Sequence, residues 1–184
     1  MSMPPAAIAA SDLPEILLRD ALDFWCRLGD AGAAAPMADR LDLSQMDRRL
    51  LPHLALTTAP AEKDGRILGL FIGSAAAIAV GRDIAGRYLD EVYPPALYST
   101  AYHFLALIAQ TGRPVYETFE IGQDAGQRVM AARLGMPLFD HRGQVSRILL
   151  ALHYRSCDRA RSAGVRILQE RSRLRHQTAH LVEL

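Results

Sequence analysis

An uncharged run of small and apolar residues, Ile67 to Gly81, is the feature that most limits what this chain can fold into. Arg66 and Arg82 flank the run directly. It is shorter than the roughly 20 apolar residues that a helix needs to cross a bilayer. We therefore expect this run to be buried core, and we expect no association of the chain with a membrane.

The run divides into a strand and a short helix. Ser74 can cap a helix that ends at Val80, and Gly81 supplies the residue type that commonly follows a helix end. Glycines recur every four residues before this short helix. In a membrane helix this spacing is typical of helix pairing, whereas in a strand it indicates a bulge or close backbone approach. We expect the strand for these residues, which are Gly65, Gly69 and Gly73.

Length and composition indicate one globular domain with short extensions. Half of the 184 residues are hydrophobic and 22% are charged, as in soluble globular proteins. The formal net charge of +1 disfavours a general polyanion-binding surface. Cys26 and Cys157 lack the spacing of a metal site or a disulfide framework, and the N-terminus lacks a basic signal segment. We expect a cytoplasmic protein without a metal.

The N-terminal pattern predicts a disordered leader over residues 1–10 and then an amphipathic helix. Ser11 or Asp12 is expected to cap this helix, and Gly29 to end it. Its apolar residues recur at helical spacing and form a wide stripe that needs a partner surface. Two alternatives stay open: the helix packs on the sheet of its own chain, or it also forms a homodimer seam. The residues assigned to that seam are Leu17, Phe24, Trp25 and Leu28.

The middle of the chain predicts an antiparallel α+β domain. After a loop over residues 29–46, a strand over 55–60 forms a hairpin with the strand that follows Asp64-Gly65. Pro95 begins a long helix, and Gly112 lies in its stop signal. Three further strands are expected at 115–121, 128–138 and 144–154.

The C-terminal segment loses the strand pattern and is rich in arginine. Ile167, Leu174 and Leu181 recur every seven residues and form a thin helical stripe. This pattern predicts a partly helical, mobile tail. The expected organisation is a leader, helix and loop over 1–49, a central domain over 50–154 and an Arg-rich extension over 155–184.

Several ordered motifs give the chain a resemblance to a known family. They are Asp23-Phe24-Trp25-Cys26-Arg27-Leu28, Leu51-Pro52-His53-Leu54, Gly73, the Gly-Arg-Asp-x-x-Gly-Arg segment from Gly81 to Arg87, and Thr111 to Val115. Over residues 50–154 the sequence resembles the PAS sensory-domain superfamily. Within it, the chain is similar to a bacterial group of small stand-alone PAS proteins.

The resemblance implies a five-stranded antiparallel sheet flanked by short helices, with a ligand cavity between helices and sheet. It names no ligand, because PAS cavities hold haem, flavin, small acids, lipids or nothing. Relatives often carry an aromatic or basic residue where this chain has Gly69 and Leu70. The reactive cysteine of flavin photosensors is missing between Ser74 and Pro95, and His103 lies on the wrong helix face to ligate haem. We therefore expect no cofactor.

The walls of such a cavity are expected to be apolar with few polar groups. The candidate ligand-binding residues are Phe71, Ile78, Leu89, Leu97, Phe104, Met130, Leu134 and His53. In the alternative interpretation the apolar members are ordinary core, and His53 is a structural hydrogen-bonding histidine.

The sequence contains none of the usual metal, nucleophile or phosphate motifs, so we do not expect an enzyme. We expect a stand-alone sensor or regulator that binds a small apolar ligand, a signalling partner protein, or both. One alternative is a ligand-free interaction scaffold. A third hypothesis is nucleic-acid binding through the Arg-rich tail, which predicts steep salt dependence.

Overall fold

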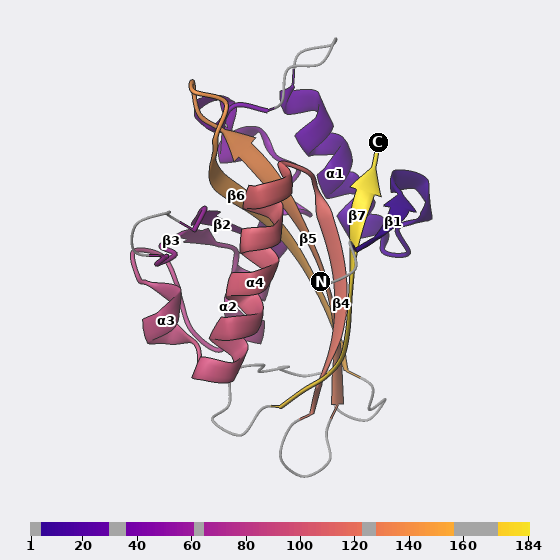
Figure 1. Ribbon diagram of the computed structural model, residues 1–184, viewed down its shortest axis with the longest axis vertical. Coiled ribbons are helices and arrows are strands. Elements are labelled where there is room, and N and C mark those ends of the chain that lie inside the picture. Colours follow the sequence, from indigo (N-terminus) through magenta and orange to yellow (C-terminus); the bar gives the residue numbers. More distant parts are fainter. Residues whose placement is uncertain (1–4, 30–35, 61–64, 123–127, 157–172) are drawn as a thin grey trace.

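A computed structural model describes residues 5–29, 36–60, 65–122, 128–156 and 173–184. Its centre is a seven-stranded sheet with the strand order β1-β7-β4-β5-β6-β2-β3 (Figure 1). Neighbouring strands are antiparallel except β1 and β7, which pair in parallel. The strands are β1 (Ala6–Ala9), β2 (Leu54–Thr58), β3 (Gly69–Ile72), β4 (Val115–Gly122), β5 (Arg128–Phe139), β6 (Val145–Ser156) and β7 (Arg173–Glu183).

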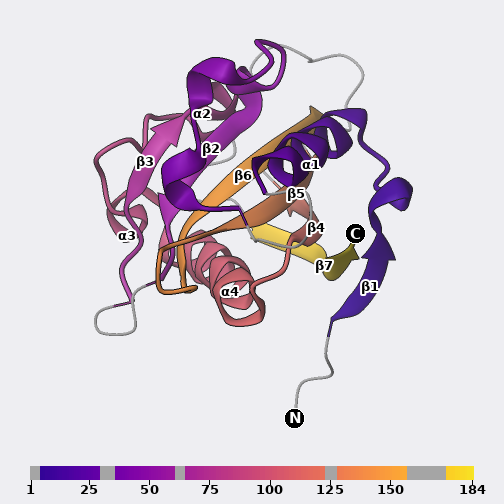
Figure 2. The same cartoon turned by 90° about the horizontal axis from the view of Figure 1, so that it is seen from above.

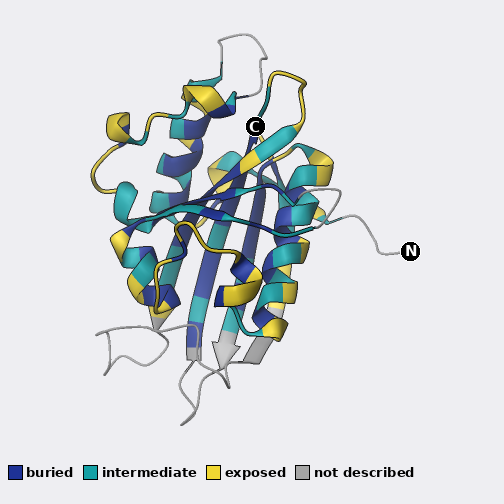
Figure 3. Cartoon of the chain, turned by 90° about the vertical axis from the view of Figure 1, so that its left-hand side faces the viewer, coloured by how far each residue is buried: buried dark blue, intermediate teal, exposed yellow. Residues whose placement is uncertain are grey.

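Helices cover both faces of this sheet. The α-helices are α1 (Ile16–Leu28), α2 (Ser74–Val80), α3 (Leu89–Val92) and α4 (Pro95–Thr111). Short 3₁₀ turns lie at Ala10–Asp12, Ala38–Arg40, Leu43–Gln45 and Leu51–His53. Figure 2 shows α1 and α4 on opposite faces of β5 and β6, and Figure 3 shows the buried residues gathered between the helices.

The alternation of side chains along β6 explains why the sheet needs two covers. Leu149 and Ala151 are buried with the residues of α1, whereas Ile148, Leu150 and Leu152 are buried with those of α4. Successive side chains of a strand point to opposite faces, so the unbroken apolar run over residues 148–152 requires packing on both sides. The predicted α+β class is confirmed.

Local sequence signals place α2, α4 and the hairpin of β2 and β3 where they were predicted. Gly81 and Gly112 end the two helices in the left-handed conformation, with φ of 86° and 62°. Gly69 lies where a side chain would collide with the backbone carbonyl of Ile84, so close backbone approach is its role. The predicted strand and short helix within Ile67–Gly81 are both present.

Three predictions for the ends of the chain are wrong. The sheet has seven strands and not five, because both terminal segments add to one edge. Residues 6–9 of the expected disordered leader form β1, and residues 173–183 of the expected partly helical tail form β7, while residues 157–172 of that tail lie outside the described residues. Leu174 and Leu181 are therefore strand residues paired with β4, while Ile167 lies outside the described residues.

Helix α1 packs on the sheet of its own chain. Trp25 is 5% exposed, and its indole Nε1 donates a hydrogen bond of 2.8 Å to the carbonyl of Pro137 on β5. Leu17, Phe24 and Leu28 are half-buried and pack against the same core. The helix begins at Ile16 after the extended Glu15, several residues later than the predicted cap. Of the two alternatives predicted for this helix, packing on the sheet of its own chain is therefore confirmed.

No helix within the described ranges is long and apolar enough to cross a membrane.

The strand assignment of the C-terminus leads to a stability prediction. Val182 is 1% exposed in the core cluster that also contains the buried residues of α1, and its N–H donates to the carbonyl of Pro114. Val182→Ala should lower the free energy of unfolding by about 2 kcal/mol, because it removes two buried methyl groups and leaves a cavity. Urea unfolding of the variant and the wild type measures this difference.

Leu184→Ala is the matched control, since Leu184 lies two residues further on and is 75% exposed. It should leave the stability nearly unchanged. Equal effects of the two substitutions would show that β7 does not contribute to the folded core.

Candidate functional site

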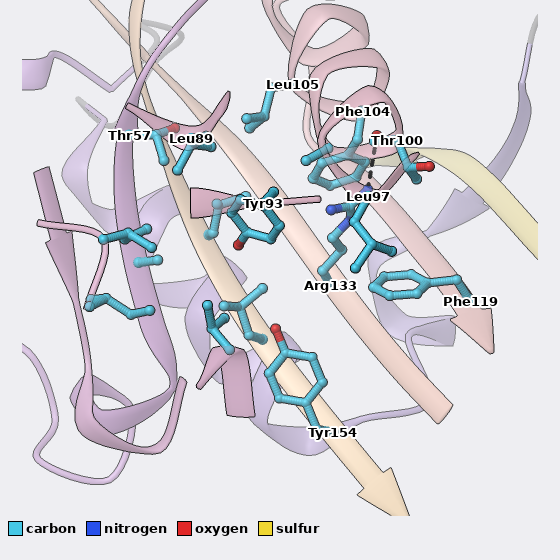
Figure 4. A pocket seen from close by; sticks show the side chains of 17 residues that line it. Thr57, Leu89, Tyr93, Leu97, Thr100, Phe104, Leu105, Phe119, Arg133 and Tyr154 are labelled. Atoms are coloured by element: carbon cyan, nitrogen blue, oxygen red, sulfur yellow. Dashed lines mark hydrogen bonds between the residues drawn. The ribbon is translucent and has the colours of Figure 1, made fainter. Parts of the chain in front are cut away.

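A cavity lies between the α2–α4 layer and the sheet (Figure 4). Its volume is about 60 Å³. This space has room for a few water molecules, at roughly 10–15 Å³ each on this measure. Its walls are mainly aliphatic and aromatic. The lining residues are Ala55, Thr57, Ile72, Val80, Ile84, Leu89, Tyr93, Leu97, Thr100, Ala101, Phe104, Leu105, Phe119, Arg133, Leu150, Leu152 and Tyr154.

Arg133 brings a charge to this apolar cavity. It lies opposite Glu117 in the register of β4 and β5, and its Nε donates to a Glu117 carboxylate oxygen at 2.5 Å. The two side chains are only 12% and 2% exposed, so the pair is buried. Gln177 on β7 donates from Nε2 to the other carboxylate oxygen at 2.6 Å. The carboxylate is therefore bonded on both oxygens.

Two aromatic rings hold the guanidinium of Arg133 in place. Its central carbon lies 4.0 Å from the ring centroid of Phe104 and 5.0 Å from that of Phe119. Cations over aromatic faces are attracted by the ring quadrupole, more strongly where water is excluded. Figure 4 shows the guanidinium below Phe104, with its hydrogen bond to the carbonyl of Thr100 on α4. Arg133 thus connects the sheet to the helix that covers it.

Two tyrosines add neutral polar groups to the cavity wall. Burial raises the pKa of the Tyr93 phenol above its ordinary value, although the nearby Arg133 opposes this effect. Burial, with Tyr93 as a second cause, also raises the pKa of the Tyr154 phenol. Both phenols therefore stay uncharged near neutral pH, and they offer hydroxyl groups rather than anions.

The structure brings three of the eight predicted ligand residues together. Leu89, Leu97 and Phe104 line the cavity, from α3 and α4. Their ligand role remains a prediction.

The other predicted residues lie elsewhere. Leu134 and Phe71 belong to the core on the α1 face, because strand alternation points them away from α4. Met130 lines a groove on that face beside the first turn of α1. Ile78 is 61% exposed, on the outer side of α2.

His53 also lies outside the cavity. Its ring hydrogen-bonds to the backbone of Leu152, and burial and the nearby His153 hold its pKa below the ordinary range. This environment fits the alternative of a structural histidine. His103 is exposed on α4 and contacts the carbonyl of Ser99 at 2.6 Å, so it does not face the cavity.

Sequence reasoning missed the polar residues of the cavity, above all Thr57 and Arg133. One signal was present: Glu117 and Arg133 are charged residues within two largely apolar strands. Opposite charges in this context indicate a cross-strand pair, but the register that makes them partners could not be read from either strand alone.

The described part of the chain contains no group of three or more His, Cys, Asp or Glu residues that could bind a metal ion. The Arg-rich residues 157–172 lie outside the described ranges, so nucleic-acid binding through them stays a prediction.

Comparisons with known proteins give partial structural likenesses. No protein-family model matches the chain, and no curated protein matches it. A VqmA–ligand–DNA complex from Vibrio cholerae is 15% identical, with a TM-score of 0.44, over 62% of this chain and 51% of the VqmA chain. The Vibrio cholerae VqmA dimer without target DNA is 16% identical, with a TM-score of 0.44, over 62% and 52% of the two chains. The chain thus spans about half the length of these proteins.

The buried pair makes a second stability prediction. Glu117→Gln should lower the free energy of unfolding by about 3–5 kcal/mol, because it leaves the charge of Arg133 buried without its counter-ion. Combining Glu117→Leu with Arg133→Met should recover most of this loss, because it removes both charges and keeps apolar volume. Urea unfolding of the single and double variants measures both changes.

Asp90→Asn is the control for charge removal as such, since the pair between Arg66 and Asp90, at 2.9 Å, lies at the surface. Its effect should be much smaller. A comparably small loss for Glu117→Gln would contradict a tightly desolvated pair.

Proposed function

We propose that this chain is a non-enzymatic signalling or regulatory protein of the stand-alone PAS type, which binds a small, mostly apolar ligand beneath α4. The single observation that carries the proposal is the cavity, whose apolar walls include a few convergent polar groups from Thr57, Tyr93, Arg133 and Tyr154. Such a composition is typical of small-molecule sites. The five neighbouring antiparallel strands β3-β2-β6-β5-β4 support the resemblance on which the class rests.

A ligand in this cavity acts by shifting a population of conformations. The polar contacts of Arg133 indicate which part of the structure a bound ligand would alter. Arg133 lines the cavity, Glu117 binds Arg133, and Gln177 binds Glu117 from β7. A ligand that moves Arg133 therefore alters a contact that fixes the C-terminal strand. We propose that a partner protein reads the resulting change at that edge or at α1.

The ligand-free scaffold remains the second candidate function. The cavity volume of about 60 Å³ favours it, because the space holds only a few waters in this conformation. In that case the lining residues serve as core, and binding occurs only at the protein surface.

A cavity-filling substitution tests the proposed ligand. Ala101 is 7% exposed on α4 and lines the cavity. In Ala101→Leu the added methyl groups occupy the space that a ligand would take. We expect native mass spectrometry to show a small-molecule adduct on purified wild-type protein and to show little or none on this variant.

Ala96→Leu is the matched control, because Ala96 is exposed on the same helix. It should retain the adduct. A bare mass for all three proteins, together with partner capture by all three, would support the scaffold instead.

We further propose a homodimer that uses the outer side of α1. Phe24→Glu and Leu28→Glu should shift sedimentation from dimer toward monomer, since both residues are only half-buried on their own core. Trp25→Phe should lower stability, because it loses the hydrogen bond to Pro137, without changing the oligomeric state. Loss of cooperative unfolding in the Glu variants, with an unchanged mass, would mean that α1 covers only its own sheet.

A further inference from the structure

One buried hydroxyl in the cavity has no partner. Thr57 lies within β2, is 0% exposed and lines the cavity. Its Oγ1 has no hydrogen-bond partner among the described residues. The neighbouring Thr58 differs, because its hydroxyl accepts the backbone N–H of Leu68 at 2.9 Å. The two threonines point to opposite faces of the strand, and only the one on the cavity side is left unbonded.

The strand itself does not account for this group. Thr57 is paired with Ile148 on β6 in a regular ladder and with Gly69 on β3, where the register shifts between Leu56 and Thr57, so its backbone is paired on both sides. A valine has nearly the same shape and also favours strands, and it would fill the position without an unmet hydroxyl. Most buried polar side chains in proteins are hydrogen-bonded, and an exception calls for an explanation. A group that enters the cavity and bonds to this hydroxyl would supply one.

The charge balance of the cavity restricts what that group can be. Arg133, the one cation among the described residues that line the cavity, is already neutralised by Glu117. The phenols of Tyr93 and Tyr154 are held uncharged by the burial that raises their pKa values. A bound carboxylate would therefore bring in an uncompensated negative charge, and an ammonium an uncompensated positive one. Desolvating an unpaired charge is far more costly than desolvating a neutral polar group.

We infer that the cavity is specific for an uncharged, mostly apolar molecule with a hydroxyl or carbonyl group, which forms a hydrogen bond with Thr57. This assignment rests on the proposed function, since it names the chemical class of the ligand for the same cavity. Arg133 has a structural role in the cavity wall. It does not serve as the counter-ion of an acidic ligand. The aromatic side chains Phe104 and Phe119 also line the cavity and add apolar surface for an apolar body.

Three probes of similar size test the assignment: phenol, toluene and benzoate. Phenol and toluene differ only in a hydroxyl in place of a methyl group, and benzoate carries a negative charge. The probes are titrated at pH 7 into the full chain labelled at its Ile, Leu and Thr methyl groups. Shifts of the methyl signals of Ile84, Leu97 and Leu105 locate binding in the cavity and give the dissociation constants.

Phenol should bind more tightly than toluene or benzoate. In Thr57→Val the affinity for phenol should fall by a factor of about 2 to 12, which corresponds to one net hydrogen bond, while that for toluene stays the same. Thr57→Ser is the matched control, because it keeps the hydroxyl and should keep the preference for phenol. The ranking of the probes on the wild type needs no variant, so the inference stays testable if one of the variants does not fold.

Different outcomes would contradict the assignment of the ligand class and the proposed ligand site itself. Equal affinity for phenol and toluene, or an unchanged phenol affinity in Thr57→Val, overturns the role of Thr57 while the ligand cavity stands. Tightest binding of benzoate overturns the assignment of an uncharged ligand. If no probe shifts the cavity methyl signals, both the assignment and the proposed ligand site are overturned.

Discussion

The buried pair of Glu117 and Arg133 is the interaction on which the centre of this structure depends. Two charges removed from water cost several kcal/mol each unless their geometry and their other hydrogen bonds compensate. Here the carboxylate is bonded on both oxygens, and the guanidinium lies against two aromatic rings. Compensation of this kind requires β4 and β5 in one register, because a slip of one residue moves each side chain to the opposite face. The pair therefore specifies the pairing of the two central strands.

The same pair explains why the C-terminal strand belongs to the fold. Without β7, one oxygen of the Glu117 carboxylate would lose the amide of Gln177, and the edge of β4 would be open. An unpaired strand edge is a template for unwanted association. Val182 closes the apolar side of the same junction in the core cluster that it shares with α1. Polar and apolar contacts thus fix β7 from both faces.

The sequence predicted the parts whose signals are local. Gly81 and Gly112 mark helix ends by their own conformational freedom, and the alternation in β6 marks the face of Ile148, Leu150 and Leu152 that is buried with α4. The end strands could not be predicted in this way. Residues 6–9 and 173–183 have weak patterns and become strands only because each finds a partner edge. The cavity depended on the same kind of knowledge, since Leu134 and Arg133 are sequence neighbours that point to opposite faces.

The edge strands also show how the cavity and α1 are connected. Gln177 bonds to the buried pair, and β7 pairs in parallel with β1, where Ala6 lies opposite His180. β1 leads through the turn at Ala10–Asp12 into α1. Hydrogen bonds and the covalent chain therefore connect the cavity wall, through β7 and β1 at the sheet edge, to α1 on the other face of the sheet.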